Sequence, residues 1–168
     1  MIDQNQFELL ADYNRWMNEK IYSTCSHLSD SELMADRGAF FKSIYHTLNH
    51  IMYGDLAFMS RFTGVPEIVP DLGVELFDTF SQLKTARFKL DTRIANWVKT
   101  LEEKWLLEVL TYTSKVDGKS RSVPRWVLVI HMFNHQTHHR GQITTLLSQL
   151  GLDIGSTDIP FMARFQAF

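Results

Sequence analysis

The chain has 168 residues, of which 45% are hydrophobic and 21% charged, with seven histidines, one cysteine and a formal net charge of −2. This length suits a single domain over residues 1–168, and one cysteine excludes a scaffold held by internal disulfide bonds. The composition excludes a disordered chain, and the near-neutral charge argues against a nucleic-acid binder. Because we find no signal peptide and no membrane-length apolar run, we expect a cytoplasmic protein that binds neither membranes nor nucleic acids.

Helical patterns dominate the first half of the chain. Apolar residues spaced alternately by three and four predict a first long helix over residues 7–28, whose apolar face is interrupted by Asn14. A capping-box pattern that begins at Ser29 predicts a short helical turn. A second long helix is expected to begin after Ser43, its N-cap, and to end at Gly64.

The second half combines two more long helices with a β-hairpin. The third long helix is predicted from about residue 74 to residue 101. The pair Asp117-Gly118 between β-prone segments predicts a hairpin, and a fourth long helix is expected from Pro124 to Leu150. These elements together predict an all-α four-helix bundle with a small hairpin before the last long helix.

Four of the seven histidines lie between residues 131 and 139, in the fourth predicted helix. His135 and His139 are four residues apart, so their side chains share one face of that helix. His46 and His50 have the same spacing in the second helix, and His50 adjoins its inward-facing stripe. A pair from one helix and a third histidine from a facing helix would form a metal site with an open position, suited to zinc, nickel, iron or copper. The alternative is that these are core histidines without a metal.

Two other metal architectures are excluded by the residues beside the histidines. The H-E-x-x-H motif needs a glutamate where Gln136 stands, and no glutamate has a histidine three residues later, as di-iron bundles require. From Gly118 to Leu152 there is no Asp or Glu. A metal held there by neutral histidines would favour an anionic ligand such as hydroxide, thiolate or carboxylate. The alternative is a helix that is simply central and apolar.

Three further residues are candidates for chemistry. Arg140 and Tyr53 are predicted to bind or orient a substrate beside the metal, although a salt bridge and core packing are the respective alternatives. Cys25 is expected to be a small buried hydrophobic residue rather than a reactive thiol.

Several motifs resemble the DinB (damage-inducible) family. The run N-H-x-x-H-H-R-G-Q at residues 134–142 is similar to the family's most characteristic helix, and N-H-I at residues 49–51 precedes it in the chain. Further similar segments are residues 13–18, 35–44 and 157–160. The resemblance therefore extends over nearly the whole chain.

The resemblance implies a four-helix bundle of up-up-down-down order, a homodimer, and one divalent metal held by His50, His135 and His139. Nickel and zinc are the metals we expect first, with iron and manganese as alternatives. Related bundles include transferases and isomerases that use low-molecular-weight thiols, so the expected function is a thiol-dependent S-transferase or a hydrolase. The alternatives are a non-catalytic module of the damage or stress response, with a structural or sensory metal, and an interaction protein that acts through its dimer surface.

Overall fold

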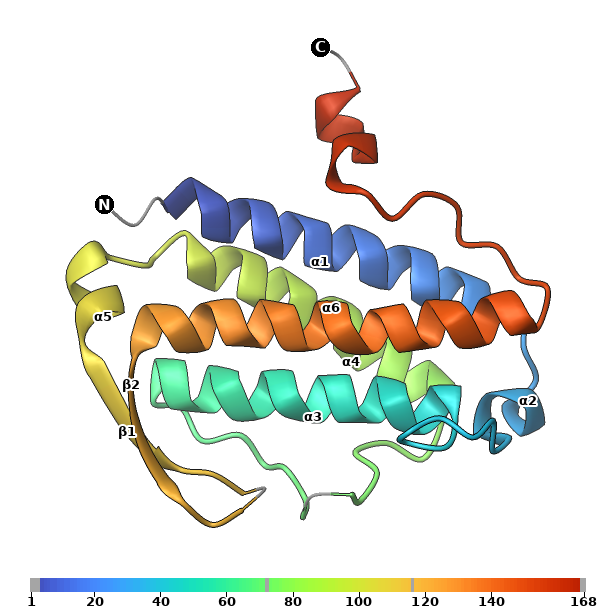
Figure 1. Cartoon of the computed structure of the whole chain (residues 1–168), viewed down its shortest axis with the longest axis horizontal. Coiled ribbons are helices and arrows are strands. Elements are labelled where there is room, and N and C mark those ends of the chain that lie inside the picture. Colours follow the sequence, from blue (N-terminus) through green and yellow to red (C-terminus); the bar gives the residue numbers. More distant parts are fainter. Residues whose placement is uncertain (1–3, 72, 116, 167–168) are drawn as a thin grey trace.

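The computed structural model describes residues 4–71, 73–115 and 117–166. Over these residues the chain is mostly helical, with one small two-stranded antiparallel sheet (Figure 1). The elements in chain order are α1 (Gln4–Cys25), α2 (Asp30–Met34), α3 (Ile44–Thr63), α4 (Phe80–Val98), α5 (Glu103–Leu107), β1 (Val109–Thr113), β2 (Ser120–Pro124), α6 (Arg125–Gln149) and two 3₁₀ turns, η1 (Ile159–Phe161) and η2 (Ala163–Phe165).

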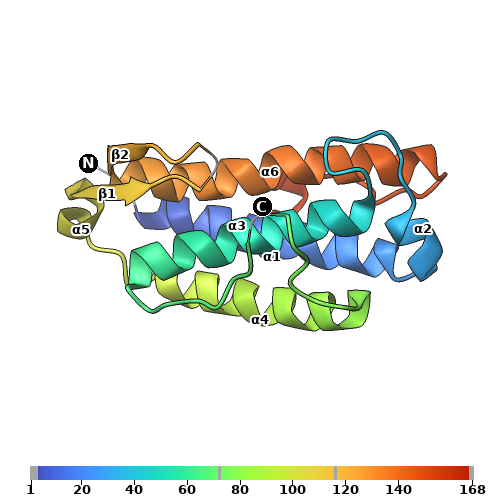
Figure 2. The same ribbon diagram turned by 90° about the horizontal axis from the view of Figure 1, so that it is seen from below.

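The four long helices α1, α3, α4 and α6 lie side by side (Figures 1 and 2). Helix α1 packs against α4 and α6, and α3 packs against the same two helices. The apolar core lies between them, where burial of apolar side chains supplies the main driving force for folding. In the described ranges, no helix is both long and apolar enough to cross a membrane.

The directions of the long helices differ from the expected order. Helices α1 and α6 run one way and α3 and α4 the other, which is up-down-down-up in chain order (Figure 1). Gln4, at the start of α1, donates to the carbonyl oxygen of Lys99 just after α4, at 2.8 Å, so these two helices are antiparallel. In an up-up-down-down order α1 and α3 would run the same way, whereas they run in opposite directions (Figure 1), so that prediction is wrong.

The connections between the helices explain this order. Residues 26–43, which include α2, connect α1 to α3 at one end of the molecule, so the chain reverses there (Figure 1). Residues 64–71 and 73–79 instead run back along α3, and α4 begins at the end of the molecule where α3 began (Figure 2). Contacts with the start of α3 hold this segment: His46 Nε2 is 2.7 Å from Glu75 Oε1, and the Leu76 N–H donates to Asn49 Oδ1.

The same contacts shorten the third long helix. Its apolar pattern predicts a start near residue 74, but the helix begins at Phe80, because Thr79 is its N-cap and accepts a hydrogen bond from the Gln82 N–H. It ends at Val98, before the predicted residue 101, and is followed by the short α5, which the pattern does not predict.

The first long helix, predicted over residues 7–28, begins and ends three residues earlier, at Gln4 and Cys25, and the remaining predicted boundaries lie close to the observed ones. The Ser29 capping box and the Ser43 N-cap are both present. The hairpin pairs Val109 with Pro124 and continues to the pair Thr113–Ser120, which confirms its position. Pro124 is the last residue of β2 rather than the first of α6.

Candidate metal centre

Three histidines from two helices converge at the contact between α3 and α6. His50 comes from α3, and His135 and His139 come from α6. One nitrogen atom of each ring lies within 4.8 Å of the others, and the Nε2 atoms of His50 and His135 are 3.0 Å apart. The structure thus brings His135 and His139, the i, i+4 pair of α6, together with His50 of α3. This is the set of three that the family resemblance implies.

The backbone of α3 makes room for one of these rings at Gly54, one turn after His50. A Cβ atom at this position would lie 3.0 Å from Cε1 and 3.3 Å from Nδ1 of His135. The His135 ring therefore packs against the α3 backbone in a space that only glycine leaves free.

Two neighbouring side chains orient the other rings. Gln142, three residues after His139, accepts a hydrogen bond from His139 Nδ1 at 2.8 Å, which directs Nε2 toward the other histidines. Phe41 stacks on the His50 ring with centroids 3.9 Å apart, and its edge contacts His139. The loop before α3 thus covers one side of the cluster.

Burial keeps the three imidazoles neutral. Burial, the larger cause, and the proximity of the other histidines together lower the pKa of His50 to about 4 and that of His135 to about 3. Burial also lowers the pKa of His139, although its hydrogen bond to Gln142 acts in the opposite direction and raises this pKa. Neutral imidazole is the form that binds metal ions.

The donor set fits a divalent transition metal. Two nitrogens bound to one tetrahedral zinc ion are separated by about 3.3 Å, close to the 3.0 Å between His50 and His135. Without a metal, the same contact is a hydrogen bond from one ring to the other. The three histidines could therefore hold a metal ion, whose identity this donor set does not select.

The other four histidines lie outside this cluster. His46 contacts Ser43 and Glu75, and His131 packs on Phe58 at the surface. His138 is exposed and lies 3.5 Å from the Gln142 amide, and His27 follows the end of α1.

Tyr53 lies one turn from His50 and is only 7% exposed. Its hydroxyl is buried and has no hydrogen-bond partner among the residues that the structure describes. The Lys115 ammonium, from the hairpin, lies 5.8 Å from the centre of its ring. A buried phenol without a partner costs free energy, so this hydroxyl is suited to bind a ligand or water.

Arg140 points away from the histidines into the core. It is 3% exposed and donates hydrogen bonds to Asn14 of α1 and to the side chains of Gln136 and Thr137. Its contact with a substrate stays a prediction, because the observed contacts are with Asn14 of α1 and with two side chains of α6 itself. Cys25 is fully buried in α1, as expected.

A buried polar cluster next to the histidines is not foreseen from the sequence. The run without acidic residues in α6 suggests that no carboxylate lies nearby, yet the Asp55 carboxylate of α3 accepts a hydrogen bond from Gln136 at 2.8 Å. Its charge faces Arg87 of α4, with which it forms a buried ion pair. The sequence offers two signals of this cluster, Asn14 and Asp55, which are polar residues on otherwise apolar stripes of their helices.

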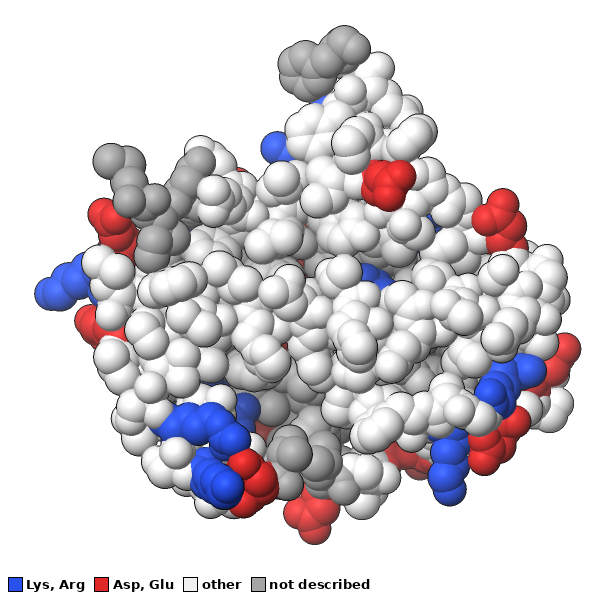
Figure 3. Space-filling view, in the orientation of Figure 1, with Lys and Arg blue, Asp and Glu red and all other residues white. Residues whose placement is uncertain are grey.

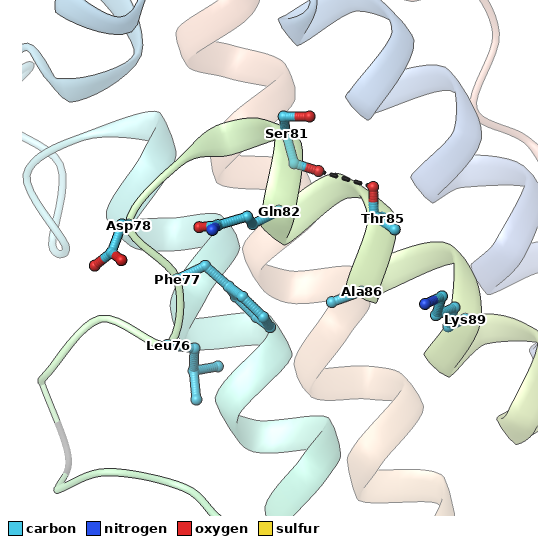
Figure 4. A pocket seen from close by; sticks show the side chains of 8 residues that line it. All are labelled: Leu76, Phe77, Asp78, Ser81, Gln82, Thr85, Ala86 and Lys89. Carbon is cyan, nitrogen blue, oxygen red and sulfur yellow. Dashed lines mark hydrogen bonds between the residues drawn. The ribbon is translucent and has the colours of Figure 1, made fainter.

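In the view of Figure 3, uncharged side chains cover most of the middle of the molecule, and most acidic and basic side chains lie toward its edges. A hollow of about 530 Å³ lies elsewhere, between residues 76–78 and the outer face of α4, and is lined by Phe77, Gln82 and Lys89 among others (Figure 4). This hollow is not part of the histidine cluster.

Comparisons with known proteins agree with this picture. A family model described as the DinB family matches residues 1–167. Protein DinB of Bacillus subtilis (strain 168) is 27% identical over 157 residues, which is 89% of this chain and 88% of that protein. The crystal structure of a DinB-like protein from Bacillus cereus ATCC 10987 is similar with a TM-score of 0.61 and 19% identity, covering 84% of this chain and 90% of that one. The similarity to this crystal structure shows a shared fold.

Proposed function

The chain belongs to the DinB family, and we propose that it is a metal-dependent enzyme whose His50, His135 and His139 hold one divalent transition metal. The observation that carries this proposal is the convergence of three neutral imidazoles from two helices. Three protein ligands leave one position for substrate, as is typical of catalytic rather than structural zinc sites. Nickel or zinc is the proposed metal, with iron and manganese as alternatives.

We propose a thiol-dependent S-transfer as the reaction, with hydrolysis as the second candidate. When bound, the metal would supply a Lewis acid that polarises a thiol or carbonyl group of the substrate. The chain's own residues support an anionic ligand, because the three imidazoles are neutral and Arg87 balances the buried Asp55. Phe41 shields one side of the His50 ring from water.

Tyr53 is the better supported of the two candidate substrate residues. Its buried hydroxyl has no partner in the described part of the chain, so a substrate oxygen or nitrogen could accept its proton in a hydrogen bond. Arg140 is already engaged with three side chains, and we propose that it acts by holding α6 in place.

We further propose that the four long helices form a bundle, that two chains form a homodimer, and that the protein acts in the cytoplasm on a low-molecular-weight thiol. The family resemblance is the support for these points. The molar mass in solution, measured by light scattering, tests the dimer directly, and a monomeric mass would contradict it.

Metal analysis of the purified protein tests the site. We expect one divalent ion per chain in the wild type and its loss in His50→Ala or His135→Ala, because each variant removes a donor that no other described residue replaces. His27→Ala is the control, since this exposed histidine follows the end of α1 and lies outside the cluster. Metal retained by His50→Ala would contradict the assignment.

The reaction is tested on metal-loaded protein. Addition of a low-molecular-weight thiol to the cobalt-loaded wild type should produce a sulfur-to-cobalt charge-transfer band, and turnover should conjugate an electrophile. Absence of conjugation with any common bacterial thiol would end the transferase proposal. If the metal binds but no thiol reaches it, and His50→Ala mainly lowers Tm, the metal has the structural or sensory role instead.

A further inference from the structure

A cluster of buried polar side chains lies behind the histidines, in the core shared by the four long helices. Each of its members is at most 3% exposed. The cluster consists of Asn14 and Asn18 of α1, Asp55 of α3, Arg87 and Asp91 of α4, and Gln136 and Arg140 of α6.

One half of the cluster joins α1, α3 and α4. The Arg87 guanidinium forms ion pairs with Asp55 and, at 2.8 Å, with Asp91. The Asp91 carboxylate accepts hydrogen bonds from the amides of Asn14 and Asn18, both at 3.0 Å.

The other half joins α6 to α3 and α1. The Gln136 amide donates to Asp55 Oδ1 at 2.8 Å, and its oxygen accepts from Arg140 at 3.1 Å. Arg140 also donates to Asn14 Oδ1. These bonds close a ring across all four long helices, and the two carboxylates balance the two guanidinium groups.

On α3 and α6, ring residues lie in the same turns as the histidines. Gln136 and Arg140 each directly follow a proposed ligand, His135 and His139 respectively. Asp55 directly follows Gly54, against which the His135 ring packs. The Asp55–Gln136 bond therefore joins α3 to α6 at the level where their histidines meet.

Apolar packing alone sets the relative position of two helices only loosely, since the hydrophobic effect has no direction. Hydrogen bonds constrain both distance and angle. A metal site needs its ligand atoms placed within about 0.2 Å. Buried ionic groups often add little stability over apolar residues of similar size, and their best attested use is to select one register of packing.

We propose that Gln136 is a positioning residue for the metal centre, and that its bond to Asp55 fixes the register of α6 against α3 so that His135 and His139 meet His50. This inference rests on the proposed metal site. It assigns to Gln136 an effect on metal binding that goes beyond its effect on stability.

The test compares two variants that each remove one buried amide from the same cluster. Gln136→Met removes the bond between α3 and α6, and Asn18→Leu removes a bond between α1 and α4, remote from the histidines. Cobalt(II) is titrated into each full-length metal-free protein. The dissociation constant and the visible absorption spectrum are recorded together with the urea midpoint.

We expect both variants to lower the urea midpoint, but only Gln136→Met to weaken cobalt binding, by about tenfold, and to alter the spectrum. Unchanged cobalt affinity in Gln136→Met would overturn the inference, because affinity would then be independent of Gln136. An equal loss of cobalt affinity in both variants would overturn it too, because affinity would then simply follow stability. If Gln136→Met does not fold, Gln136→Asn, whose amide is one methylene shorter, takes its place. Failure of the wild type to bind cobalt would contradict the proposed metal site itself.

Discussion

At the scale of single residues, three histidines are distinguished from the other four by their surroundings. His50, His135 and His139 contact one another and are partly or fully buried, whereas His131 and His138 are exposed on the same helix. The low pKa values follow from this burial and from the mutual proximity of the rings. His131, His135 and His139 are each four residues apart on α6, so spacing alone gives two candidate pairs. The position of His50 on α3 selects the pair His135 and His139.

The single cysteine gives a prediction at this scale. Burial raises the pKa of Cys25 to about 12, so its thiol is both protonated and inaccessible. We expect no reaction of the native protein with a thiol reagent such as dithionitrobenzoate, and one thiol per chain after unfolding in guanidinium chloride. Rapid labelling of the native protein would show that Cys25 is reachable and reopen its role in a thiol-dependent reaction.

At the scale of elements, the contact between α3 and α6 determines the geometry of the site. Gly54 lets the His135 ring approach the α3 backbone, and the Phe41 ring closes the side toward the loop before α3. The glycine of α6, Gly141, is different in kind, because a Cβ atom added there would meet no other atom within 4 Å.

Alanine substitution at the two glycines should therefore have different effects. In a helix, alanine is favoured over glycine by about 0.5–1 kcal/mol. We expect Gly141→Ala to raise the free energy of unfolding by this amount and to leave metal affinity unchanged. Gly54→Ala should lack this gain and weaken metal binding, because its Cβ displaces the His135 ring.

Urea denaturation and metal titration of both variants measure these effects. Equal stabilisation by the two substitutions, with metal affinity retained in Gly54→Ala, would show that α3 does not constrain the His135 ring.

At the scale of the whole molecule, the connection between α3 and α4, described at residues 64–71 and 73–79, decides how the helices are arranged. It returns along α3 and is held by the His46–Glu75 pair and by the Leu76–Asn49 bond. Helices α3 and α4 consequently run parallel, which places Asp55 opposite Arg87 in the core. The buried polar ring depends on this order of the helices.

The stability of the metal-free protein should depend on pH through the buried histidines. The pKa of His50 falls from 6.5 in the unfolded chain to about 4 in the folded protein, and that of His135 falls to about 3. Between these values the two histidines bind more protons in the unfolded chain, so they lower the free energy of unfolding as the pH is lowered from about 6.5 to about 4. Their combined effect outweighs the opposite effect of Asp55, whose pKa burial raises to about 6.

Urea midpoints measured across this range, in the presence of a chelator, test the dependence. The double variant His50→Gln/His135→Gln is the control, and its midpoint should vary less with pH. An equally steep decrease in the double variant would assign the effect to other groups.

Local sequence signals suffice to predict the long helices, the hairpin and the i, i+4 histidine pair, because caps, turn residues and helical periodicity act over a few neighbouring residues. The Ser43 N-cap and the His135/His139 pair are such local features. The up-down-down-up order, the engagement of Arg140 with Asn14, and the Asp55–Gln136 bond beside the histidines emerge only in the folded chain. These features join residues far apart in the chain, and a polar residue on an apolar stripe reveals that it needs a partner but not which helix supplies it.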